Sequence, residues 1–300
     1  MYTDFHVNST EYEREFWNVA RGKGSVGKLD AGKHNMTGTY KLPAVSMKKY
    51  KAALLKENPF RSLATIVNVP GNDKSIRTYD ADDIATWLGE KTLEYYDGED
   101  TFNTIRVANH RLGTIIRISA DFTADEKFDI EKYLSKSFAK RIGRTEEDAF
   151  VNGDGIDKPT GILTTAEVGA ETSELTYEDV VKLYFSVDKE YRKNGIWMMN
   201  DETAQKLRTI KDEGGNYIWN HNNDTIMGKR VVLSNAMPTT GKPVAFGDFS
   251  YFWIVERIPL TIRPLVEKYA LNNQIGYFGY EHLDGKLIRP DAIKTINITA

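Results

Sequence analysis

Residues 150–163 read FVNGDGIDKPTGIL and place three glycines and one proline between two apolar ends. An Asn-Gly pair often ends a helix in a left-handed conformation, an Asp-Gly pair favours a tight turn, and proline prevents a helix from resuming. We interpret the stretch as a structural corner that follows a helix. The corner residues are Asn152, Gly153, Asp154, Gly155 and Pro159.

A metal site is the alternative interpretation of the same stretch, because Asn152, Asp154 and Asp157 offer oxygen ligands. A calcium loop of the helix–loop–helix kind needs more acidic residues and a terminal Glu at fixed spacing. Lys158 and Pro159 stand there instead. We therefore expect no metal in the corner.

The segment before the corner predicts a long helix over residues 124–150. Thr123 and Glu126 have the spacing of a capping box, and apolar residues then recur every four positions, as on one side of a helix. The apolar row is Ile130, Leu134, Phe138 and Ile142.

A second row on this helix is basic and lies on the opposite side, two positions from the apolar row. It consists of Lys132, Lys136, Lys140 and Arg144. A solvated helix face is the simpler interpretation. The alternative is that the row meets an acidic neighbour or a polyanion such as DNA.

Residues 61–118 have strand patterns, with a turn signal at PGNDK and alternation of polar and apolar residues at 104–107. Little of this segment can form a core of its own, and a two-stranded ribbon alone is marginal in water. Either the ribbon folds back on its own chain or a second chain supplies its partner.

The remaining segments mix helices and strands. We expect a helix over 9–21 capped by Ser9, an extended arm over 22–43, a helix over about 44–57, and a helix over 176–193 capped by Thr176. IWMMN (196–200) is a buried strand, and Asp201 caps the helix that follows it. Strand patterns return in the last 70 or so residues.

Composition limits the classes of function. The 300 residues carry a net charge of −3 and no cysteine, so any contact with nucleic acid is local, and disulfides and thiolate metal sites are excluded. The N-terminus lacks the pattern of a signal peptide, and no apolar run is long enough to span a membrane.

No enzyme signature is present in the sequence. Residues 22–28 match a phosphate loop up to its lysine, but Leu29 replaces the hydroxyl that would hold magnesium. The five histidines are scattered, and neither a nucleophile elbow nor a metalloprotease motif occurs. We expect a protein that is not an enzyme and has no cofactor.

Several phrases together resemble the major capsid proteins of tailed bacteriophages, which have the Hong Kong 97-type fold. The corner with its preceding helix is typical of that family, and so are later phrases in the same order. They are EYEREFWNVARGKG (11–24), DAFVNGDGIDKPTGIL (148–163), WMMNDETAQKLRTIKDEGGNYIW (197–219), GKRVVLSNAMP (228–238), KPVAFGDFSYFWIVER (242–257) and QIGYFGYEHLDGKLIRPDAIKTI (274–296).

The resemblance implies an α+β fold with five parts. They are an N-terminal arm (1–40), a peripheral domain (41–60 and 119–159) containing the spine helix (about 124–150), an extended β-hairpin loop (61–118) that lies over a neighbouring subunit, an axial domain (160–270), and return strands to the peripheral domain (271–300).

The function implied is self-assembly into pentamers and hexamers of an icosahedral shell that encloses the genome of a tailed phage or prophage. The basic row would then face the lumen and contact packaged DNA without sequence specificity. The resemblance further implies a virion protein assembled in the host bacterial cytoplasm, partners among scaffolding, portal and decoration proteins, and no membrane contact.

Two family features differ here. The chain starts close to the usual mature arm, so scaffolding is a separate protein, is not needed, or has been trimmed away. Some relatives also join subunits by Lys–Asn isopeptide bonds. Asn273 matches the acceptor, but Tyr95 stands at the lysine position and Tyr280 at that of an assisting Glu, so we predict no cross-link.

Three alternatives remain at this point. An encapsulin-like nanocompartment would use the same fold around enzyme cargo. A soluble metal-dependent hydrolase would need a group of converging acidic residues or histidines, and a nucleic-acid-binding module would be expected to be basic.

Overall fold

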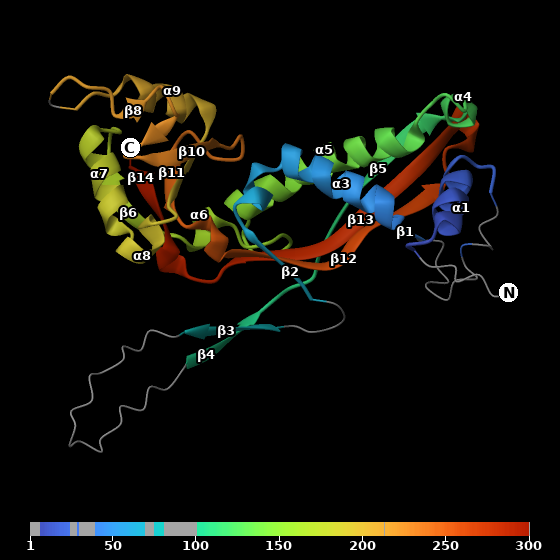
Figure 1. Cartoon of the computed structure of the whole chain (residues 1–300), viewed down its shortest axis with the longest axis horizontal. Coiled ribbons are helices and arrows are strands. Elements are labelled where there is room, and N and C mark those ends of the chain that lie inside the picture. Colours follow the sequence, from blue (N-terminus) through green and yellow to red (C-terminus); the bar gives the residue numbers. More distant parts are fainter. Residues whose placement is uncertain are drawn as a thin grey trace, which may run out of the picture.

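The chain forms two β-sheets with their helices, arranged along one long axis, and a two-stranded ribbon that extends away from them (Figure 1). Figure 1 shows the computed structural model on which the description rests. It describes residues 7–24, 29, 40–69, 75–80, 101–212 and 214–299, with the side chains of 78–80 and 101–103 left out.

The first sheet is built on two long antiparallel strands, β12 (Phe252–Leu265) and β13 (Gln274–Leu287). Strand β5 (His110–Ser119) pairs with β13, while the short strands β1 (Tyr40–Lys41) and β2 (Thr65–Asn68) pair with β12. We call this the long sheet. It spans most of the length of one half of the molecule (Figure 1).

Helices cover one face of the long sheet. The spine helix α5 (Ile130–Asn152) and helix α3 (Ala44–Glu57) lie side by side on it, and α1 (Thr10–Ala20) packs at its far end (Figure 1). The predicted apolar row of the spine helix is confirmed as buried: Ile130, Leu134, Phe138 and Ile142 are each about 1% exposed or less.

The spine helix begins later than the sequence suggests. Its N-cap is Asp129, whose carboxylate accepts the Lys132 amide at 2.9 Å. Thr123 lies in the short helix α4 (Ala120–Ala124), and its hydroxyl donates to the Ala120 carbonyl. The predicted capping box is therefore wrong, because the backbone turns at Asp125 and a stronger cap follows it.

The second sheet has seven strands in the order β6-β14-β11-β7-β10-β9-β8. Helices α7 (Tyr177–Ser186), α8 (Lys189–Arg192) and α9 (Asp201–Thr209) pack with it around the buried Trp197 and Phe246. Its strands are β6 (Glu167–Thr172), β7 (Ile196–Met199), β8 (Trp219–Asn220), β9 (Thr225–Ile226), β10 (Lys229–Leu233), β11 (Gly241–Gly247) and β14 (Ile293–Ile298).

Short elements connect these parts. They are α6 (Ile162–Thr165) and the 3₁₀ helices η1 (Pro59–Ser62), η2 (Phe249–Tyr251), η3 (Ala270–Asn272) and η4 (Pro290–Ala292).

Two helix predictions in the second unit need correction. The helix expected over 176–193 is divided, because Val187 and Asp188 are extended between α7 and α8. Thr176 does cap α7, in a capping box with Asp179. The cap of α9 is Asn200, which accepts the Thr203 amide at 2.7 Å, and Asp201 is the first helical residue.

The sheets do not follow the expected boundaries along the chain. Strand β12 belongs to the long sheet although it lies within 160–270, and β14 belongs to the second sheet although it lies within 271–300. Strands β2 and β5 are likewise part of the long sheet, so the ribbon itself contains only β3 (Ser75–Asp80) and β4 (Thr101–Arg106).

Gly279 lets the spine helix approach the long sheet closely. A side chain at this position would place its Cβ 2.4 Å from the Phe138 ring, which is fully buried between helix and strand. The packing of α5 on β13 therefore depends on a position without a side chain.

Replacing Gly279 with alanine should lower the free energy of unfolding by about 1–3 kcal/mol, because the added methyl overpacks this contact. Thermal and urea unfolding of the wild type and variant measure the change. In the double variant with Phe138→Leu, the two costs should be less than additive. Equal stability of Gly279→Ala and wild type would contradict the packing described.

Candidate assembly surfaces

The ribbon is a separate two-stranded sheet. Its strands pair over six residues, from Ser75 opposite Arg106 to Asp80 opposite Thr101. Among its described side chains, Ile76 at its base packs with Val107 and with Val255 of β12. Beyond that base the ribbon extends away from both sheets (Figure 1). A pair of strands with so little burial needs a further partner to be stable.

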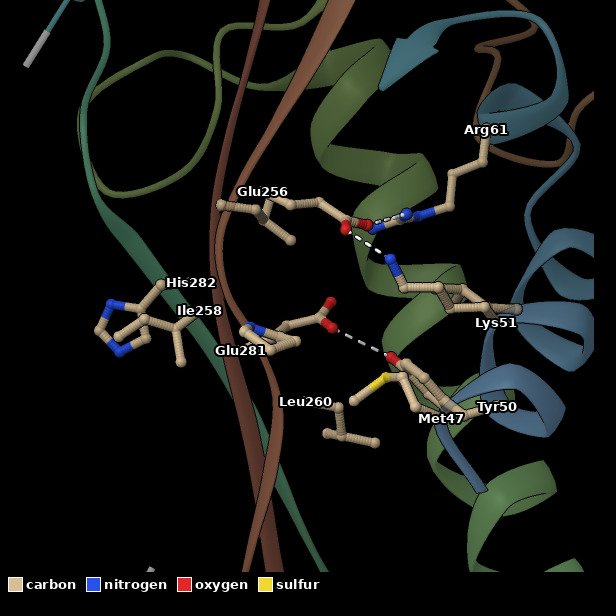
Figure 2. Close-up of a pocket in the computed structure, with 12 residues that line it drawn as sticks. Met47, Tyr50, Lys51, Arg61, Glu256, Ile258, Leu260, Glu281 and His282 are labelled. Carbon is tan, nitrogen blue, oxygen red and sulfur yellow. Dashed lines mark hydrogen bonds and ion pairs between the residues drawn. The ribbon is translucent and has the colours of Figure 1, made fainter. Parts of the chain in front are cut away.

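A buried charge cluster lies between the helices and the long sheet. Arg61, in the turn that leads into β2, donates Nε and Nη2 to the two carboxylate oxygens of Glu146 at 2.7 and 2.6 Å. Its Nη1 donates to Glu256 of β12 at 2.6 Å. Arg61 and Glu146 are almost completely buried. One guanidinium thus joins the turn before β2, the spine helix and the long sheet, as Figure 2 shows in part.

Glu281 of β13 is the third carboxyl group of the cluster. It is 5% exposed, and the Tyr50 hydroxyl donates to its Oε2 at 3.1 Å, while no donor reaches its Oε1 (Figure 2). The pKa of Glu281 is raised well above its ordinary value, mainly by burial and in addition by the neighbouring Glu146. The ionised form of Glu281 is therefore disfavoured in the folded chain.

The other two carboxylates of the cluster have cations as partners. Burial acts to raise the pKa of Glu256, but Arg61 and Lys51, whose ammonium lies 2.8 Å from it, hold that pKa below its ordinary value. Arg61 pairs with Glu146 and Glu256, and Lys51 pairs with Glu256. An ionised Glu281 would add a buried charge without a cation of its own, which would be costly.

The sequence contains a signal for this cluster that was missed. Glu146 occupies the next position in the apolar row of the spine helix, four residues after Ile142, and Phe150 continues the row. Glu281 likewise follows Tyr277 and Gly279 on the helix-covered face of β13. A carboxylate at a core position of an otherwise apolar pattern indicates a buried partner.

The corner after the spine helix is formed by close backbone contacts. Gly153 ends the helix in an extended conformation, and a Cβ there would lie 1.9 Å from the Pro159 carbonyl. The left-handed residue is Gly155, with φ +79°. The expected left-handed end at Asn152-Gly153 is therefore wrong. Glycine is required at 153 because a side chain would not fit there, and not because of a positive φ.

The corner also connects the two units of the chain. Asn152 donates from its side chain to the Ala236 carbonyl of the second unit at 2.7 Å. Asp154 accepts the Ile156 amide at 3.0 Å in a local turn, and Pro159 is buried. Asp157 is exposed. Within the described ranges, no three His, Asp or Glu side chains converge as metal ligands would.

The basic row lies on the solvent side of the spine helix. Its four members are exposed and point away from the long sheet, which contacts the opposite side of the helix. They are Lys132, Lys136, Lys140 and Arg144. The structure places them on one continuous surface and does not by itself identify what they contact.

The far end of the long sheet presents apolar side chains to solvent. Phe122 of α4 is 61% exposed, and Leu271 in the turn between β12 and β13 is fully exposed. Asn273 is in the same turn, in a left-handed conformation, and its side chain donates to Asp121 at 3.3 Å. Tyr280 lies on β13, whereas Tyr95 lies outside the described residues.

Membrane insertion has no support in the described part of the chain, where every helix is too short or too polar to cross a bilayer.

Comparison with known proteins gives one family match. The model of the phage capsid family matches residues 38–298. A search of curated proteins finds no match.

Similar solved structures include two capsids of a gene transfer agent and a structure from a phage. The capsid of an empty gene transfer agent particle, computed with C5 symmetry, is 26% identical, with a TM-score of 0.66 over 80% of this chain and 89% of that chain. The capsid of the native particle is also 26% identical, with a TM-score of 0.63 over 83% and 90%. A structure from Gordonia phage Cozz has the same fold at 13% identity, with a TM-score of 0.61 over 81% and 87%.

The charge cluster predicts a pH-dependent effect of Glu281→Gln. Because the folded-state pKa of Glu281 is raised above the ordinary 4.5, its stabilising contribution is complete below pH 4.5 and is lost as the pH rises toward the raised pKa. Glutamine does not titrate. The variant should therefore gain stability relative to wild type above pH 4.5, by at most about 1.4 kcal/mol per pH unit.

Urea unfolding from pH 4 to pH 9 measures this difference. The control is Glu146→Gln, which removes a charged partner of Arg61 and should cost about 3 kcal/mol or more at neutral pH. A difference between Glu281→Gln and wild type that stays constant or falls with pH would show that Glu281 is ionised in the folded chain.

Proposed function

The chain belongs to the phage capsid family, and we propose that its copies assemble into pentamers and hexamers of an icosahedral shell that encloses DNA. It is a structural, non-enzymatic capsid protein with the Hong Kong 97-type fold, of a tailed phage or a gene transfer agent. Its place is the capsid of the particle.

The observation that carries the assembly mechanism is the ribbon. Among its described side chains, Ile76 and Val107 at the base pack with Val255 of β12. Its two strands pair with each other and with no other described strand. A two-stranded ribbon that leaves the body in this way suits a part that lies on a neighbouring subunit. Many such modest contacts around closed rings sum to a stable shell.

The remaining parts take the roles that the resemblance implies. The long sheet with α3 and α5 is the peripheral unit, and the seven-stranded unit is the axial one, whose tips meet at the five-fold and six-fold centres. The segment 1–40 is an arm that reaches a neighbour, and α1 within it anchors it to its own subunit: the buried Tyr277 hydroxyl donates to the Ala20 carbonyl at 2.6 Å.

The basic row supports a contact with packaged DNA. Four exposed cations spaced along one side of the spine helix form a linear positive surface. Such a surface binds phosphates regardless of base sequence and loses affinity as salt rises. Scaffolding, portal and decoration proteins are further partners that the resemblance suggests.

Shortening the ribbon tests the assembly mechanism. Asp80 and Thr101 are paired, so residues 81–100 can be replaced by Asn-Gly, which closes a two-residue hairpin. The variant should keep the wild-type melting temperature, because the core is unchanged, and should fail to form rings or shells. Negative-stain electron microscopy at high protein concentration and moderate salt compares it with wild type.

Rings or closed particles are expected for the wild type. A wild type that stays monomeric under all conditions, or a shortened variant that assembles normally, would contradict the mechanism.

Neutralising the basic row tests the DNA contact. The variant with glutamine at 132, 136, 140 and 144 should still form shells that retain less nucleic acid, with a weaker salt dependence of binding. The matched control changes four cations of the axial unit: Lys189, Lys193, Lys206 and Lys211. Equal loss of nucleic acid in both variants, measured by the absorbance ratio at 260 and 280 nm, would contradict a specific role for the spine helix.

A further inference from the structure

One face of the long sheet is covered and the other is open. Tyr277 and Gly279 of β13 point toward the helices, since Gly279 lies against Phe138 of the spine helix. Side chains alternate along a strand, so Phe278 and Tyr280 point to the opposite face. Phe278 and Tyr280 are partly exposed there.

The open face is rich in arginine and aromatic residues. Arg111 and Arg117 of β5 and Arg263 of β12 share it with the two β13 rings, as the register of the strands shows. Tyr269 also lies over it, against Gly276. We call this the arginine–aromatic face: Arg111, Arg117, Arg263, Tyr269, Phe278 and Tyr280.

Aromatic rings hold two of the guanidiniums in place. The Cζ atom of Arg111 is 4.2 Å from the centre of the Tyr280 ring and 5.3 Å from that of Phe278, and the two rings stack at 5.3 Å. Arg117 lies 5.7 Å over Tyr269. A guanidinium against a ring keeps its N–H groups available at the edge, where they bind carboxylates.

These cations lack acidic partners among the described residues. No ion pair joins Arg111, Arg117 or Arg263 to a carboxylate there, although all three are exposed. On this face, the residues of β5 and β12 that pair with residues 274–282 of β13 include three arginines and no acidic residue. The face therefore presents a fixed positive charge on an apolar base.

The ribbon end has the complementary chemistry. Residues 81–100 join β3 to β4 and lie outside the described part of the chain. They contain seven acidic residues and one lysine, a net formal charge of −6, together with Trp87, Tyr95 and Tyr96. Opposite charge and shared aromatic character are what a specific contact between two such surfaces requires.

We propose that the arginine–aromatic face of one subunit binds the acidic ribbon end, residues 81–100, of a second copy of the chain. This inference rests on the proposed assembly function and identifies the surface that receives the ribbon. Three exposed lysines outside both proposed binding surfaces, Lys48 and Lys56 of α3 and Lys127 before the spine helix, serve as the control.

Reciprocal charge reversal tests the proposal. The sheet variant is R111E/R117E/R263E, the ribbon variant is D82K/D83K/D97K/E99K, and the control is K48E/K56E/K127E, at three exposed lysines. Melting temperature confirms folding of each, and the ribbon variant changes nothing in the described core. Each of the first two should need at least about tenfold more protein for half-maximal assembly, whereas the control should assemble as wild type does.

An equimolar mixture gives the sharpest outcome. In the sheet variant both the face and the ribbon end are negative, and in the ribbon variant both are positive. Opposite charges therefore meet at every contact only if the two variants alternate around a ring. The mixture should therefore regain assembly, and its rings should contain even numbers of subunits: hexamers form and pentamers do not. Native mass spectrometry and negative-stain microscopy count the subunits. Rescue between two chains also excludes binding of each ribbon to its own subunit.

The outcomes separate the two proposals. A wild type that never assembles overturns the proposed function and the inference with it. A wild type that assembles together with unaffected sheet and ribbon variants overturns the inference alone. Failure of the mixture to recover, or equal impairment of the lysine control, also overturns it, because the charges would then act without direct contact.

Discussion

The buried contact of Arg61 with Glu146 and Glu256 is the interaction on which the architecture depends. It joins three segments that are far apart in the sequence: the turn before β2, the spine helix and β12. A buried arginine requires carboxylates at close range, and each carboxylate would be costly without it. The contact therefore disfavours arrangements that separate the turn, the helix and the sheet, and burial disfavours the ionised form of Glu281 beside it.

The ribbon differs from the body of the subunit in how it packs. The body of the subunit has continuous cores under the long sheet and the second sheet, whereas the ribbon has only a small cluster at its base. A ribbon whose two strands pair with no other described strand is suited to a contact with a neighbour. The open face of the long sheet carries three arginines, and its charge is opposite to that of the acidic residues 81–100.

Much of the fold could be predicted from local sequence, and the reasons for the failures are physical. The apolar row of the spine helix, the Ser9 and Thr176 caps and the end of α3 before Pro59 follow from short-range rules. The start of the spine helix was missed because two caps compete within seven residues, Thr123 and Asp129. The sheet boundaries were missed because β12 and β14 pair with strands distant in the sequence. The charge cluster was detectable only as carboxylates at core positions.

The central claim is that a neighbouring copy completes each subunit. Reconstruction of assembled particles by electron cryomicroscopy tests it most directly, because the density shows where every ribbon lies. The account predicts that each ribbon crosses to the adjacent subunit and covers the open face of its long sheet. Ribbons that fold over their own subunits, with that face exposed throughout the particle, would contradict it.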